Sequence, residues 1–256
     1  AELSFNYIFL ANLIMYVLFA IVAITQFNLE IHVKFKHQDA IDLKSKENKK
    51  RFTAMMLICA MFAICWIAYI QWETSIASFT QSINISMSQY SVLWTINGIM
   101  ILVAQPLIRP IIVILRGNLK RQMLVGILVF MSSFLVTSFA NHFAIFVVGM
   151  VILTFGEMFV WPAVPTIANK LAPEGKQGQY QGFVNSASTV GKAFGPFIGG
   201  VLVDTFNMSM MFIGMIVLLC FGLIFLGLFD RGLPKDYNDN QPEREPRRKR
   251  KQRHNA

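Results

Sequence analysis

One acidic and one basic side chain, Glu157 and Lys192, lie in the middle of two consecutive apolar stretches. A charged group near the centre of a bilayer costs roughly 2.5–3.5 kcal/mol on insertion scales, so a spanning helix usually keeps one only with a partner or a task. Counted along a helix, the two residues lie at nearly the same depth, roughly 16–18 Å from one end. We therefore expect them to face one polar pathway, as an ion pair or through water, with Glu157 exchanging a proton against a cationic substrate and Lys192 stabilising its carboxylate. The alternative is a fixed ion pair that only holds two helices together.

Aromatic and proline residues gather around Glu157. Phe155 and Trp161 offer flat faces on which a cation can stack, although each also fits ordinary packing. Pro162 and Pro165 remove backbone donors and predict a kink or hinge in this stretch. The sequence therefore predicts a substrate site next to the acid, with the prolines allowing movement.

Polar and small residues in three other stretches complete the candidate site. Tyr69, Gln71 and Asn97 are expected to hydrogen-bond a substrate in a polar cavity. The glycines that follow one another at intervals of four place a smooth face on one helix, where another helix can approach closely or slide. These packing or hinge residues are Gly191, Gly195, Pro196 and Gly199.

The composition indicates an all-α membrane protein. Hydrophobic residues make up 55% of the 256 residues, the mean hydropathy is +0.51, and charged residues make up 14%, against about 25% in a soluble domain. Seven apolar stretches each meet the length of about 17–25 residues, or slightly more with tilt, that a spanning helix needs. We expect seven transmembrane helices at residues 3–28, 53–78, 90–115, 122–140, 143–168, 180–204 and 208–229.

Basic residues alternate between the connections, and this pattern predicts the orientation. The first, third and fifth connections and the C-terminal tail carry Lys or Arg, whereas the second, fourth and sixth carry none. Because cytoplasmic loops are enriched in these residues, we expect the N-terminus outside and the tail in the cytoplasm of a multi-pass cell-membrane protein. The net charge of +9 is then explained by contact of the basic tail with anionic lipid headgroups, and no nucleic-acid partner is expected.

The unequal connections suggest four segments. Residues 1–28 form a helix that belongs to a preceding bundle, and residues 29–52 form a Lys-rich cytoplasmic loop. Residues 53–230 form a six-helix bundle, and residues 231–256 a basic tail too polar to fold. The sequence has no metal-ligand cluster, nucleotide-binding loop or catalytic triad spacing, so we predict no enzyme activity, no metal and no cofactor.

Several local motifs resemble the major facilitator superfamily and, within it, bacterial drug/proton antiporters. Gly156-Glu157 followed by Pro162 is similar to the tenth-helix pattern of multidrug members. Lys176-Gln177-Gly178 with Gly182 resembles the loop that enters the eleventh helix, and Gly195-Pro196 with Gly199-Gly200 resembles a glycine-proline motif of these antiporters. The segment from Arg116 to Arg121 keeps the charge of a family signature but lacks its Asp.

The resemblance implies the C-terminal half of a twelve-helix secondary transporter that works by alternating access. Its partners would be a small-molecule substrate, protons, the lipid bilayer and an N-terminal six-helix half, covalent or separate. The implied activity is proton-coupled efflux of amphipathic or cationic molecules, with Glu157 in the coupling role. The alternatives are a facilitator of sugars, peptides or lipids and a non-transporting membrane scaffold subunit.

Overall fold

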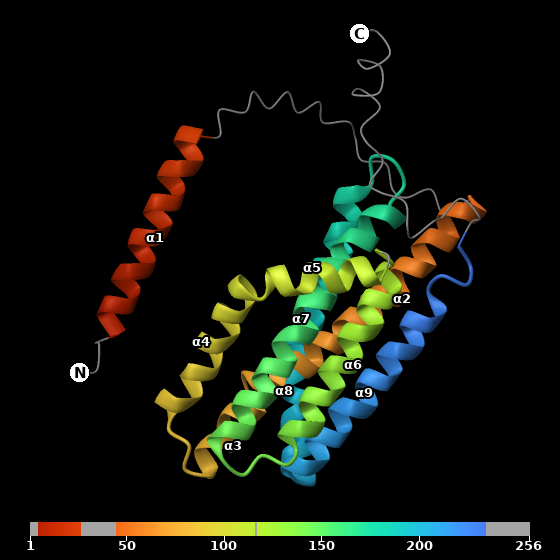
Figure 1. Ribbon diagram of the computed structural model, residues 1–256. Helices are drawn as coiled ribbons and strands as arrows, with labels where there is room; N and C mark the ends of the chain where they lie inside the picture. Colours follow the sequence, from red (N-terminus) through yellow and green to blue (C-terminus); the bar gives the residue numbers. More distant parts are fainter. Residues whose placement is uncertain (1–4, 27–44, 116, 234–256) are drawn as a thin grey trace. The chain divides into compact units, whose positions relative to one another are not determined.

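The computed structural model describes residues 5–26, 45–115 and 117–233, and the regular elements within these ranges are all helices (Figure 1). The chain divides into two units, Ala1–Ala40 and Ile41–Ala256, which are described separately. Most of the predicted Lys-rich loop and of the basic tail lies outside the described residues. The prediction of an all-α membrane fold is confirmed.

The first unit contains α1 (Phe5–Gln26), a helix of 22 residues. Its large apolar side chains are exposed, with Phe9 and Phe19 each 71% and Ile24 80% accessible. A helix that is apolar on every side is suited to hydrocarbon or to other apolar helices, and not to water.

The second unit is a helical bundle in which capping residues define several helix starts. The side chains of Ser86, Asn118 and Asn207 accept hydrogen bonds from backbone N–H groups in the first turns of α4, α6 and α9, which satisfies donors that have no partner inside the helix. The elements are α2 (Lys46–Tyr69), η1 (Ile70–Trp72), α3 (Ser75–Ser82), α4 (Met87–Val103), α5 (Gln105–Ile114), α6 (Leu119–Thr137), α7 (Phe143–Leu171), α8 (Gln177–Thr205) and α9 (Met208–Leu228).

Three helix pairings hold the bundle together. α6 and α7 pack along each other, while α2 packs against both α8 and α9. The α6–α7 contact is close because Gly126 and Gly156 face each other: a Cβ atom at Gly126 would lie 2.6 Å from the Val160 side chain, and one at Gly156 would lie 3.0 Å from the Gly126 carbonyl oxygen. Only glycine allows the two backbones to approach this closely. The core around these contacts contains fully buried Phe130, Phe134, Phe146 and Phe212.

Within the described residues, four segments are long and apolar enough to cross a membrane: residues 46–82, 119–137, 143–171 and 208–228. Two shorter apolar helices cover residues 9–25 and 87–103. α8 has the required length, at 29 residues, but is not among the segments that are apolar enough. Of the seven predicted spans, four therefore meet the criteria of length and apolarity on their own.

The predicted spans 53–78 and 90–115 differ most from the structure. α2 begins at Lys46, seven residues before the predicted start at residue 53. Its first turns contain an ion pair between Arg51 and Glu47, which lies one turn earlier, at 2.9 Å. The predicted span 90–115 is divided at Ala104 into α4 and α5, which meet at an angle (Figure 1). Pro106 occupies the first turn of α5, a position where its missing N–H is not needed.

Candidate functional site

An amide side chain on α4 forms a hydrogen bond to Glu157 on α7. The Asn97 side chain donates one N–H to Oε2 of Glu157 at 2.9 Å and the other to Oγ1 of Thr154 at 3.0 Å. Thr154 itself donates to the Met150 carbonyl oxygen at 2.8 Å. Glu157 is half-buried and Asn97 is buried, so both amide hydrogens of Asn97 are used to orient the acid and the helix that carries it.

Lys192 has a different neighbour. Its Nζ lies 4.0 Å from the centroid of the Trp66 ring, a cation–π contact between α8 and α2. No ion pair within 4.0 Å joins Lys192 to Glu157 in the described part of the chain. The direct ion pair considered from the sequence is therefore absent from this structure. Glu157 and Lys192 thus do not form a fixed ion pair that holds two helices together. Each charged group has a partner of its own.

An aromatic cluster joins α2, α4, α6 and α7. The Trp161 ring stacks on Phe130, with centroids 5.4 Å apart and planes 13° apart, and lies 4.9 Å from the Trp66 ring. Tyr69 lies 5.4 Å from Trp161 and 6.1 Å from Trp94. Ring pairs of this kind contribute about 0.5–1.5 kcal/mol beyond their area burial. The aromatic cluster consists of Phe62, Trp66 and Tyr69 on α2, Trp94 on α4, Phe130 on α6 and Trp161 on α7.

The aromatic cluster connects the two charged residues. Lys192 contacts Trp66, and the Trp66 ring lies 4.9 Å from the Trp161 ring. Trp161 follows Glu157 by four residues on α7, so the two lie on the same helix face. Cationic groups bind to the faces of such rings, most strongly to Trp. The arrangement thus places ring faces of the kind that attract cations close to a carboxyl group.

Gln71 lies elsewhere, in the contact between η1 and α8. Its side chain is fully buried, and its amide donates to the carbonyl oxygens of Ile67 at 2.9 Å and Gly195 at 2.7 Å. Its carbonyl oxygen accepts a hydrogen bond from Ser75 at 2.8 Å. Both amide hydrogens are thus used by the protein in this conformation, so Gln71 acts as a clamp between two helices and does not join Tyr69 and Asn97.

The three spaced glycines of α8 line the same contact. A Cβ atom at Gly191 would lie 2.6 Å from the Ala63 carbonyl oxygen, one at Gly195 would meet the Ile70 side chain, and one at Gly199 would lie 2.6 Å from Cδ of Gln71. α8 can approach α2 and η1 this closely only because these positions have no side chain. Pro196, on the exposed side, leaves α8 unbroken.

The prolines of α7 also lie in a continuous helix. α7 runs from Phe143 to Leu171 through Pro162 and Pro165. The Gln181 side chain on α8 donates to the Pro165 carbonyl oxygen at 2.8 Å, which ties this part of α7 to the next helix. The proposed hinge remains a prediction.

Sequence reasoning missed several participants. Thr154 precedes Glu157 by three residues and so lies on the same helix face, which is a signal that could have been used. Trp94 and Phe130 had no such signal, because Trp94 contacts Tyr69 and Phe130 contacts Trp161, each on a different helix. Conversely, the half-buried Phe155 makes no ring contact with the described aromatic residues.

Comparison with known proteins identifies relatives of the chain. A family model described as Major Facilitator Superfamily matches residues 52–255. An uncharacterized MFS-type transporter of Bacillus subtilis, YttB, is 43% identical over 241 residues, which is 94% of this chain and 61% of that protein. A second, MJ1560 of Methanocaldococcus jannaschii, is 43% identical over 54 residues, 21% of this chain and 14% of its own length. The chain thus spans about three fifths of the length of YttB.

Proposed function

Since the chain belongs to the major facilitator superfamily, we propose that it forms part of a secondary transporter and not of an enzyme. The transporter exports amphipathic or cationic small molecules in exchange for protons by alternating access. The observation that carries this proposal is the contact of the Lys192 ammonium with Trp66, in an aromatic cluster whose Trp161 lies one turn after Glu157 on α7. The protein's own cation occupies a ring face that a substrate cation can use.

Substrate recognition would depend on the aromatic cluster. Trp66 and Trp161 are half-buried, so part of each ring is accessible. A flat or lipophilic cation gains attraction from these ring faces and apolar contact from the ring edges. Lys192 has to leave the Trp66 face before such a cation can take its place.

Glu157 would make the exchange obligatory. Asn97 occupies Oε2 of the carboxylate, whereas Oε1 accepts no hydrogen bond from another described residue. An ionised Glu157 attracts the substrate cation, and a protonated Glu157 does not. Because one carboxylate cannot hold a proton and serve as counter-ion at the same time, protonation on one side of the membrane releases the cation there.

The exposed side of α8 supports a position beside an aqueous path or another protein surface. Asn185, Thr189 and Lys192 are exposed on this helix, and polar side chains facing hydrocarbon are costly. We propose that an N-terminal six-helix half, covalent or separate, lies opposite this side and completes the pathway. We further propose that the bundle comprises residues 53–230, with its C-terminal tail in the cytoplasm.

Transport by the full-length protein in proteoliposomes tests the proposal. With an imposed pH gradient, Glu157→Gln is expected to lower proton-driven accumulation of tetraphenylphosphonium by at least about tenfold. Glu174→Gln is the matched control, because Glu174 is an exposed acid in the connection between α7 and α8. Unchanged coupling in Glu157→Gln, in protein that elutes as a single folded species, would contradict the proposed role.

A further inference from the structure

A groove lies between the beginning of α6 and the end of α9, away from the aromatic cluster. It is open to the outside and has a volume of about 330 Å³. Its apolar wall consists of Leu124, Leu223 and Leu226 together with the backbone at Gly227, while Lys120 and Arg121 provide its basic side. The groove thus joins an apolar surface to positive charge at the ends of two helices that are long enough to span a membrane.

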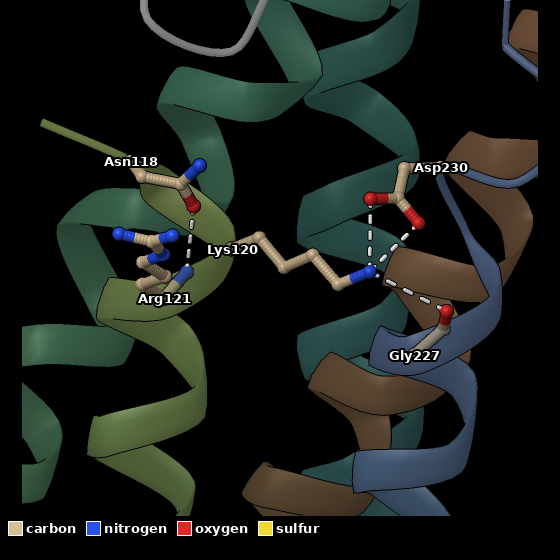
Figure 2. Close-up of polar contacts among 5 residues, drawn as sticks. All are labelled: Asn118, Lys120, Arg121, Gly227 and Asp230. Atoms are coloured by element: carbon tan, nitrogen blue, oxygen red, sulfur yellow. Dashed lines mark hydrogen bonds and ion pairs between the residues drawn. The ribbon is translucent and has the colours of Figure 1, made fainter.

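The two basic residues have different surroundings, which Figure 2 shows. Lys120 bridges the helices: its Nζ lies 2.7 and 2.8 Å from the carboxylate oxygens of Asp230 and 3.4 Å from the Gly227 carbonyl oxygen. Asp230 is therefore neutralised by Lys120. Arg121 is exposed, and its guanidinium has no ion pair or hydrogen bond with another described side chain. Arg121 leaves the rim with one uncompensated positive charge.

The apolar part of the groove adjoins surface suited to lipid. Leu124, in the wall, is 42% exposed, and Leu128, one turn further along α6, is 48% exposed. On α9, Phe221 and Ile224 are exposed as well. In a membrane, such side chains face acyl chains, and the ends of the same helices lie at the level of the headgroups.

We propose that this groove binds an anionic phospholipid. Arg121 contacts the phosphate with the planar fork that suits phosphate oxygens, while an acyl chain follows the leucine wall between α6 and α9. Lys120 joins α6 to α9 and neutralises Asp230, so the lipid meets one net positive charge, that of Arg121. A zwitterionic lipid fits the apolar wall but brings a positive group as well, which removes the charge preference. Basic pockets between helices at the headgroup level bind anionic lipids in this way.

Lipid binding to the purified, delipidated full-length protein tests the inference. Native mass spectrometry would count retained dioleoyl phosphatidylglycerol or dioleoyl phosphatidylcholine at matched concentrations. One retained phosphatidylglycerol is expected, and Arg121→Gln should weaken its binding about fivefold, the effect of one basic residue near the surface. Lys50→Gln is the matched control, because Lys50 is also exposed at a helix end but does not line the groove.

A second variant tests the shape of the groove separately from its charge. A Cβ atom built at Gly227 meets no atom of another helix within 4 Å, so Gly227→Leu can fill the groove without removing a charge. It should weaken phosphatidylglycerol binding at least as much as Arg121→Gln, while Gly227→Ala should have a smaller effect. The inference is overturned if both Arg121→Gln and Gly227→Leu bind like the parent protein, or if phosphatidylcholine binds equally well. It is also overturned if glycerol 3-phosphate displaces the lipid at equal concentration, since the site would then bind a soluble anion.

Discussion

Replacing Lys192 by methionine is expected to strengthen the binding of a lipophilic cation to the full-length protein. Methionine keeps most of the length of the side chain but removes its charge. In the structure the ammonium lies 4.0 Å from the centroid of the Trp66 ring, and the side chain is exposed. At exposed sites a cation–π contact contributes about 0.5–1 kcal/mol. A substrate cation that no longer has to displace Lys192 should therefore bind about two- to fivefold more tightly.

Titration of tetraphenylphosphonium, followed by tryptophan fluorescence or calorimetry, measures this change. Lys192→Arg keeps the charge and the ring contact, so the dissociation constant of tetraphenylphosphonium for this variant should not fall below that of the parent protein. Lys50→Met is the control for a lost positive charge at an exposed position away from the aromatic cluster. If Lys192→Met leaves the affinity unchanged or lowers it, the competition between Lys192 and the substrate for one ring face is refuted.

A double-mutant cycle assigns the effect to the ring. In a Trp66→Leu background there is no indole face for Lys192 or for the substrate cation to occupy. The gain caused by Lys192→Met should then largely disappear, with a coupling free energy close to the cation–π contribution of about 0.5–1 kcal/mol. An undiminished gain would mean that Lys192 acts by general charge repulsion and not through Trp66.

The contact between η1 and α8 yields two further predictions. Gln71→Leu removes three hydrogen bonds and leaves the Gly195 carbonyl oxygen without its side-chain donor, so the free energy of unfolding in mixed micelles should fall by about 1–3 kcal/mol. An unchanged value would contradict the role of Gln71 in joining η1 and α8. Gly199→Ala should lower the free energy of unfolding by about 1–3 kcal/mol, because its methyl group would overlap with Gln71. Gly200→Ala is the control and should have no such effect, because a Cβ atom there meets no other part of the protein within 4 Å. Equal effects of the two variants would contradict the close approach of α8 to Gln71.

The helices were predictable because their physical cause is local. A segment that crosses hydrocarbon needs a long run of apolar residues whatever the rest of the chain does, so the apolar stretches of the sequence coincide with helices. The break at Ala104 and the early start of α2 at Lys46 were not predicted. Lysine and arginine are good helix formers, and charge alone therefore did not mark where the loop ends and α2 begins.

The partners of Glu157 and Lys192 show why depth alone could not identify the site. Each charged residue directly follows a glycine buried in a helix contact: Gly156 faces α6, and Gly191 faces α2. One residue along an α-helix turns the side chain by about 100°. Glu157 is thereby turned away from the α6 contact and reaches Asn97 on α4, while Lys192 is turned out of the α2 contact and covers the Trp66 ring from outside. Two side chains at the same depth meet only if they also point toward each other around their helices. Here the positions next to the packed glycines direct Glu157 and Lys192 to different partners.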